Sequence, residues 1–260
     1  MTEWNASEYA RISTLQGAMA SEVLALLDLK GTERVLDVGC GNGKTTAEIA
    51  ARLPQGSVVG VDASVDMIAF AATHEAVHSN LQFAVADAQQ LPYQHEFDLV
   101  VSFNALHWIP QQALALRSIH SALKQDGLAQ LRLVPKGERK SLEDVLEDTR
   151  LSARWVAHFR GFRDPYLHLT PDQYKALAEE NGFKVAAIRV AAKSWDFQSR
   201  SAFKAFGGVT FVEWTRHLPQ EERLAFATDV LDRYRQVACD MPGEENFFRF
   251  YQMDVTLSPR

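Results

Sequence analysis

The feature that most constrains this chain is a short apolar run that leads directly into three closely spaced glycines. Residues 34–38, Arg-Val-Leu-Asp-Val, predict a buried strand, and Gly39-Cys-Gly-Asn-Gly43 follows it at once. Residues 44–53 have the composition of a helix, which Pro54 ends. Glycines between a strand and a helix let a ligand approach the backbone, and the helix N-terminus offers it free N–H groups. The pattern therefore predicts a ligand site at this turn.

The same alternation of strands and helices continues along the chain, with Ser64 as the expected N-cap of the next helix. Further strands are expected at 57–61, 81–85, 97–102, 128–134, 183–190 and 247–257. Helices are expected at 64–76, about 110–123, and 171–180 between Thr170 and Asn181-Gly182. Strands that alternate with helices predict an α/β fold, a doubly wound and mostly parallel sheet with helices on both faces.

The remaining segments show no clear strands and are predicted to be mostly helical. They comprise residues 7–29, the stretch 136–170, and two helices within 199–240 that Leu218-Pro219 separates. We predict a single domain over residues 1–260, with its core at 30–135, 171–197 and 245–260. A helical lid over this core is expected from residues 1–29, 136–170 and 198–244.

Polar side chains stand at the ends of four consecutive predicted strands: Asp37, Asp62, Asp87 and Asn104. Each of them alone is typical of a turn or a helix cap. Because the carboxyl ends of parallel strands meet at one edge, where open α/β sheets bind ligands, the four together favour a binding site. Asp62 stands where an acid that binds the ribose hydroxyls of a nucleoside cofactor is expected.

Two nucleoside cofactors compete for this turn, a nicotinamide dinucleotide and S-adenosylmethionine. A dinucleotide site usually has Gly-x-Gly-x-x-Gly, because a pyrophosphate rests on the helix end. This chain has Gly-x-Gly-x-Gly, with Asp37 just before it. A carboxylate there would repel a pyrophosphate but would suit the ammonium group of an amino-acid moiety. The charge argument favours S-adenosylmethionine.

With these motifs, residues 34–134 resemble the class I S-adenosylmethionine-dependent methyltransferases. The resemblance implies a Rossmann-like sheet of seven strands whose last strand runs antiparallel. It also implies that Asp62 binds the ribose, that Ala63 and Met67 flank the adenine, and that Asp87 with Ala88 receives the adenine edge. The residues expected to bind the cofactor are Tyr9, Ser13, Asp37, Gly39, Gly41, Asp62, Ala63, Met67, Asp87, Ala88 and Asn104.

Two further stretches concern the methyl acceptor. Tyr9, Ser13 and Gln16 share one face of the opening helix, although an ordinary solvated face would look the same. His107-Trp108 lies just past the fourth strand, beside the expected methyl group, although core packing is the more common fate of such a pair. Both stretches resemble those of the juvenile-hormone acid methyltransferases, and the dipeptide also resembles that of the trans-aconitate methyltransferases.

A carboxylate acceptor agrees with the chemistry of these residues. Carboxylates are already ionised at neutral pH, so methyl transfer to one needs positioning and desolvation rather than a strong base. Gln16 and Trp108 are expected to hold one oxygen of a small organic acid, with His107 assisting or packing beside them. A phenol or amine would more often need a base, a role that His107 could fill. O- or N-methylation of such a metabolite, and S-adenosylmethionine binding without catalysis, stay open as alternatives.

The predicted lid leaves the shape of the acceptor open. Its large apolar side chains would line a cleft for a lipophilic acid or form the lid's own core; they are Phe159, Phe162, Tyr166, Phe203, Phe206, Val209, Phe211 and Trp214. Its arginines would meet a second carboxylate or lie at the surface; they are Arg150, Arg154, Arg160 and Arg163.

Composition narrows the partners. Lys and Arg number 27 against 33 Asp and Glu, and this net charge of −6 argues against nucleic acid as the acceptor. Cys40 and Cys239 have no metal-type spacing, so no metal is expected. No stretch approaches the ~20 apolar residues that cross a bilayer. Because residues 1–11 do not resemble a secretory signal either, we expect a cytoplasmic protein without a membrane partner.

Overall fold

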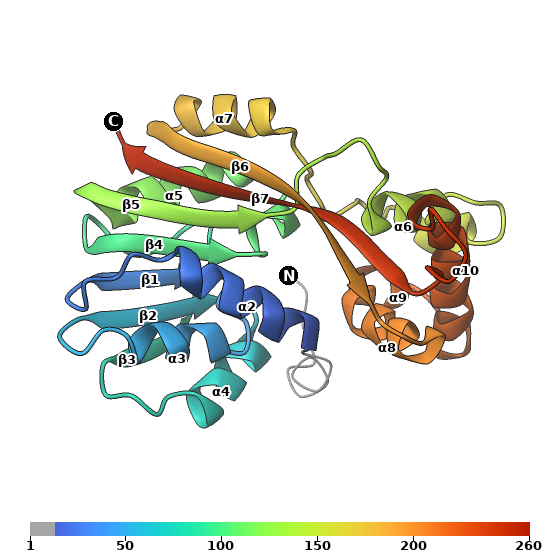
Figure 1. Cartoon of the computed structure of the whole chain (residues 1–260), viewed down its shortest axis with the longest axis horizontal. Helices are drawn as coiled ribbons and strands as arrows, with labels where there is room; N and C mark the ends of the chain where they lie inside the picture. The colour runs from blue at the N-terminus through green and yellow to red at the C-terminus, as the bar shows by residue number, and fades with distance from the viewer. Residues whose placement is uncertain (1–13) are drawn as a thin grey trace.

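Seven strands form one sheet in the computed structural model, which describes residues 14–260 except for the side chains of a few residues in the first helix (Figure 1). The strand order is β3-β2-β1-β4-β5-β7-β6. In chain order the strands are β1 Arg34–Val38, β2 Ser57–Asp62, β3 Leu81–Val85, β4 Phe97–Phe103, β5 Leu123–Leu133, β6 Phe183–Asp196 and β7 Phe247–Pro259. Strands β1 to β5 pair in parallel, and β7 runs antiparallel between β5 and β6. The predicted doubly wound, mostly parallel sheet is confirmed.

Helices connect the strands and begin where the sequence offers caps. Ser64 accepts the Met67 N–H at 3.3 Å, and Thr170 accepts the Gln173 N–H at 3.3 Å, as both predicted N-caps require. The described helices are α2 Thr14–Leu26, α3 Lys44–Ala50, α4 Val65–His74, α5 Gln112–Ala122, α6 Leu142–Arg150, α7 Pro171–Glu180, α8 Arg200–Thr210, α9 Val212–Thr215 and α10 Gln220–Ala238. Two short 3-10 turns are η1 Leu106–Trp108 and η2 Val156–Phe159.

Several predicted element boundaries were wrong. Strand β5 begins at Leu123, five residues before the predicted 128, because Leu123 already pairs with Phe97 across an irregular stretch of polar residues. Strand β6 continues past 190 to Asp196, since its pairing with β7 persists there although its outer side chains are exposed. The stretch 136–170 contains only α6 and η2, so it is less helical than expected.

Hydrophobic packing divides the molecule into two ends. The sheet and its covering helices share cores around residues such as Leu36, Val100 and Ile119. A separate aromatic core, which includes Trp155 and Phe226, lies within a helical group made of α6, α8, α9 and α10. Figure 1 shows this helical group at the far end of the long β6 and β7 strands, beyond the carboxyl edge of the parallel strands. Its assignment as a lid stays a prediction.

Candidate functional site

A cavity of about 650 Å³ opens at the carboxyl edge of the parallel strands and reaches the helical group. It brings together most of the predicted site residues: Gly39, Gly41, Asp62, Ala63, Met67, Asp87, Ala88, Asn104, His107 and Trp108. Tyr9 and Ser13 lie outside the described residues, and the side chain of Gln16, in α2, is also outside them. Asp37 is described but is not among the lining residues.

The three glycines of the turn have different tasks. All three have left-handed backbones, with φ of +77° at Gly39, +54° at Gly41 and +81° at Gly43. A Cβ on Gly39 would meet the Cβ of Ala105 at 2.3 Å, and one on Gly43 would meet Phe83 at 2.6 Å. A Cβ on Gly41 would meet nothing within 4 Å. Gly39 and Gly43 are therefore needed for packing, whereas Gly41 leaves room for a ligand at the cavity wall.

Asp62 ties the glycine turn to the end of β2. Its Oδ2 accepts the Gly41 N–H at 3.0 Å, and its Oδ1 accepts the Ser64 N–H at 2.9 Å. These bonds orient the carboxylate, and a carboxylate oxygen can accept more than one hydrogen bond, including one from a ribose hydroxyl. Asp87 is held similarly, because its Oδ1 accepts the Gln89 N–H at 2.9 Å.

Asp37 lies behind the glycine turn rather than in the cavity. Its side chain is buried, and its Oδ2 accepts the Thr46 hydroxyl at 2.7 Å in the first turn of α3. Burial raises the pKa of Asp37 to about 7, the negative charge of Asp62 acts in the same direction, and the Thr46 hydrogen bond opposes them. Asp37 thus holds the strand, turn and helix together, and its contact with a cofactor ammonium group stays a prediction.

Asn104 supplies an unused acceptor at the cavity. Its backbone is left-handed, with φ +57°, and its N–H donates to the Arg132 carbonyl at 2.7 Å. The side-chain Oδ1 is buried and has no hydrogen-bond partner among the described residues. An ammonium group would satisfy this oxygen. Together with the open face of Gly41 and the carboxylate of Asp62, it fits the amino-acid and ribose parts of S-adenosylmethionine.

His107 is buried in η1 at the middle of the cavity wall. Its Nδ1 accepts the Val134 N–H at 3.4 Å, which leaves Nε2 as the ring nitrogen that carries the proton. Burial, with a smaller contribution from the charge of His168, lowers the pKa of His107 to about 3. The imidazole is therefore a neutral donor at physiological pH and a poor base.

Aromatic rings continue the wall from His107 toward the helical group. The rings of Trp108 and Tyr166 lie 4.0 Å apart between centroids, and His107 stacks on Tyr166 at 5.6 Å. On the other side Tyr166 stacks on Trp214 at 5.7 Å. Tyr166 was predicted only as one of the lid aromatics, because it lies far along the chain from His107-Trp108.

The lid aromatics divide between the cavity and the core. Tyr166, Phe206 and Phe211 line the cavity, and Phe206 and Phe211 belong to the aromatic core as well. Phe159, Phe203 and Trp214 belong to that core without lining the cavity. Both interpretations of the sequence therefore hold, and for Phe206 and Phe211 they hold together.

The arginines of the predicted lid are divided in the same way. Of the four arginines, Arg163 alone lines the cavity, and Arg150 and Arg154 form ion pairs with Glu147 and Asp229. Glu213 and Arg216, which line the cavity as an ion pair at 2.6 Å, were not predicted from the sequence. No motif marks these two residues.

Known proteins similar to this chain are methyltransferases. Residues 35–127 match the sequence family described as "Methyltransferase domain". The trans-aconitate 2-methyltransferase of Deinococcus radiodurans is 30% identical over 259 residues, which cover 95% of both chains. That of an Enterobacter strain is 26% identical over 95% of this chain and 93% of its own.

Solved structures show the same fold at low sequence identity. The phosphoethanolamine N-methyltransferase 2 of Haemonchus contortus, solved with S-adenosyl-L-methionine, aligns with a TM-score of 0.63 and 18% identity. The alignment covers 98% of this chain and 57% of that one. Within residues 14–260, no three His, Cys, Asp or Glu side chains are grouped to hold a metal ion, and no helix is long and apolar enough to cross a membrane.

Proposed function

Because the chain belongs to the class I S-adenosylmethionine-dependent methyltransferases, we propose that its acceptor is a carboxylate and its product a methyl ester of a small organic acid. The single observation that carries this proposal is the state of His107. A buried, neutral imidazole with a pKa of about 3 is suited to donate a hydrogen bond and unsuited to remove a proton. The names of the trans-aconitate relatives support the same acceptor class.

The proposed step needs no base. When bound, S-adenosylmethionine supplies a methyl group on a positively charged sulfur. In the proposed transfer a carboxylate oxygen would form a bond to the methyl carbon as the carbon–sulfur bond breaks, and the electron pair of that bond would stay on sulfur. No proton is released, because the acceptor is already ionised.

The residues of the chain contribute positioning and desolvation in this proposal. Nε2–H of His107 and the indole N–H of Trp108 hold one carboxylate oxygen, and the other oxygen faces the methyl group. Gln16 is a further proposed donor from α2. Asp62, Asp87 and the turn at Gly41 hold the cofactor so that the two partners meet in line.

The cavity beyond Trp108 suits an acid with an apolar body. Its wall there is mostly apolar and aromatic, with Leu15, Met19, Leu142, Leu146, Phe206, Phe211, Phe248 and Phe250. Glu143, Arg163 and the Arg216–Glu213 pair are the charged groups of this part of the described wall. Both a lipophilic acid and a polycarboxylate therefore belong in the test.

The test is a panel of acceptors incubated with the protein and S-adenosylmethionine and read by mass spectrometry. It contains trans-aconitate, a medium-chain fatty acid, a terpenoid acid, a catechol and a primary amine. We expect methylation of one or more acids, with the product cleaved by mild alkali as an ester is. Methylation of the catechol or the amine alone would contradict the proposal.

Two variants of His107 separate a donor from a base. His107→Gln keeps an N–H near the position of Nε2, and His107→Phe removes it. If His107 donates a hydrogen bond, the Gln variant keeps most of the turnover and the Phe variant loses about 10-fold or more. Equal loss in both variants, with unchanged cofactor binding, would indicate a base and so a different acceptor class.

A further inference from the structure

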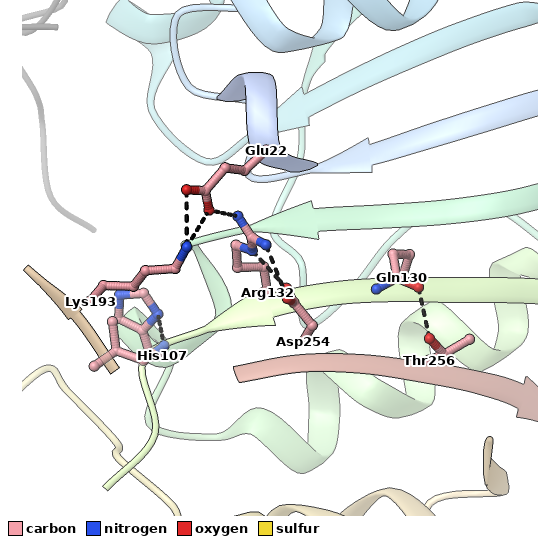
Figure 2. A network of polar contacts seen from close by, with 8 residues as sticks. Glu22, His107, Gln130, Arg132, Lys193, Asp254 and Thr256 are labelled. Carbon is pink, nitrogen blue, oxygen red and sulfur yellow. Dashed lines mark hydrogen bonds and ion pairs between the residues drawn. The ribbon is translucent and has the colours of Figure 1, made fainter. Parts of the chain in front are cut away.

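Four charged side chains connect helix α2 to the sheet beside the cavity. Figure 2 shows Glu22 of α2 between Lys193 of β6 and Arg132 of β5, with Asp254 of β7 on the other side of the guanidinium. Arg132 donates to Asp254 through Nε at 2.6 Å and Nη2 at 3.0 Å, and to Glu22 through Nη1 at 3.4 Å. Lys193 Nζ lies 2.9 and 3.0 Å from the two oxygens of Glu22.

Burial makes these partners necessary. The Arg132 side chain is only 4% exposed, and an arginine stays charged in proteins, so its charge must be balanced where it lies. Asp254 balances it with a bidentate pair. Glu22, 45% exposed, and Lys193, 33% exposed, then form an outer pair, and the four charges sum to zero. The outer pair is the part that can be changed without leaving a buried charge alone.

Both ends of this network reach the cavity. The Arg132 carbonyl accepts the Asn104 N–H at 2.7 Å, and the Val134 N–H, two residues further along, donates to His107. On the α2 side, Leu15, Met19 and Val23 line the cavity one helical turn apart from each other. The C-terminal part of α2 is held separately, since Arg52 donates to the Leu24 carbonyl at 2.8 Å.

We propose that Glu22 is a positioning residue: by pairing with Arg132 and Lys193 it holds α2 against the cavity and so sets the affinity for the cofactor. Glu22 touches neither the cavity nor the reacting atoms, and it acts through the three residues of α2 that line the wall. Leu15 and Met19 also line the part of the cavity proposed for the acceptor, so the test measures binding of the cofactor product with no acceptor present.

The test compares Glu22→Ala with Glu22→Asp in the full chain. S-adenosylhomocysteine binding is measured by calorimetry, and the amide hydrogen exchange of α2 by mass spectrometry. We expect Glu22→Ala to weaken binding about fivefold and to speed exchange in α2, because a partly exposed ion pair contributes up to about 1 kcal/mol. Glu22→Asp keeps the charge, so its binding affinity and its exchange rate in α2 should stay close to those of the natural chain.

A matched control comes from α7, where Lys175 and Glu179 form an ion pair of similar exposure that does not line the cavity. Glu179→Ala should leave S-adenosylhomocysteine binding and α2 exchange unchanged. Raising the salt concentration should lower the S-adenosylhomocysteine affinity of the natural chain more than that of the Glu22→Ala variant. Unchanged binding and exchange in Glu22→Ala, or a loss of melting temperature well beyond that of Glu179→Ala, would overturn the proposal.

Discussion

The two halves of the cavity draw on the chain differently. The half proposed for the cofactor, called the cofactor half, comes from consecutive strand ends between Asp62 and Ala105, together with the glycine turn after β1. The half proposed for the acceptor, called the acceptor half, is assembled from η1, α2, the segment around Tyr166, the helical group and β7. The first half follows largely from the alternation of strands and helices, whereas the second half depends on contacts between distant segments. The cofactor half is therefore expected to tolerate change in its neighbours better than the acceptor half.

The largest expected effect is a difference in stability between variants of two phenylalanines in the helical group. Phe203 is 1% exposed in the aromatic core and does not line the cavity, whereas Phe206 lines it. Phe203→Ala should lower the free energy of unfolding by about 3–5 kcal/mol. Phe206→Ala should cost less stability and instead raise the KM of whichever acid the panel identifies. Urea unfolding and steady-state kinetics measure both variants. Equal losses of stability together with equal KM values would contradict the assignment of Phe203 to the core and Phe206 to the cavity wall.

The next effect concerns the pH dependence of stability, which should have opposite signs for Asp37 and His107. The pKa of Asp37 rises from 3.8 to about 7 on folding, so its contribution to stability is present below pH 4 and is lost as the pH rises through 7. The pKa of His107 falls from 6.5 to about 3, so its contribution is present above pH 6.5 and is lost as the pH falls toward 3.

Two neutral variants reveal these slopes. Relative to the natural chain, Asp37→Asn should gain stability between pH 4 and 8, and His107→Gln should gain it as the pH falls from 7 to 4. The expected change is about 4 kcal/mol for Asp37→Asn and about 3 kcal/mol for His107→Gln over these ranges, since one pKa unit is worth about 1.4 kcal/mol. Urea titrations at several pH values measure both. If the relative stabilities of the two variants changed with pH in the same direction, the pKa of Asp37 or of His107 would not be shifted as described.

Within the cofactor half, substitutions at Gly39 and Gly41 should affect different properties, namely stability and cofactor binding. Gly39→Ala places a Cβ against Ala105 at 2.3 Å, and we expect a loss of more than about 2 kcal/mol in the free energy of unfolding. Gly41→Ala has the same backbone strain but no clash, so its cost should be about 1 kcal/mol. The Gly41 variant should nevertheless lose S-adenosylhomocysteine binding. If calorimetry finds that Gly41→Ala binds S-adenosylhomocysteine as tightly as the natural chain does, Gly41 does not leave room for the ligand.

The smallest expected effect compares one residue from each half. Asp62→Ala should weaken S-adenosylhomocysteine binding about tenfold, because it removes acceptors that orient the glycine turn. Trp108→Phe keeps the ring against Tyr166 but removes the indole N–H, so it should spare binding and lower turnover about tenfold. If both variants changed binding alike, the division of the cavity into two halves would fail.

Much of the cofactor half could be predicted because its determinants are local. The carboxyl ends of parallel strands meet at one edge, so the alternation alone placed Asp62, Asp87 and Asn104 together. Asp37 shows the limit of this logic, since its strand position is right but its side chain is turned toward Thr46 and away from the cavity. The pairing of β6 beyond Val190 was missed because an edge strand with exposed side chains carries no apolar alternation.

The fold class, the family and the cofactor edge of the sheet could be predicted from local patterns, because periodicity and glycine turns act between neighbours in the chain. Which aromatic side chains of the helical group line the cavity, and which lie only in its core, depends on tertiary packing. The tertiary structure also decided that His107 is a neutral donor and that Glu22 meets Arg132. Burial and charge pairing depend on segments far apart in sequence, such as the 110 residues between Glu22 and Arg132, and no local pattern encodes them.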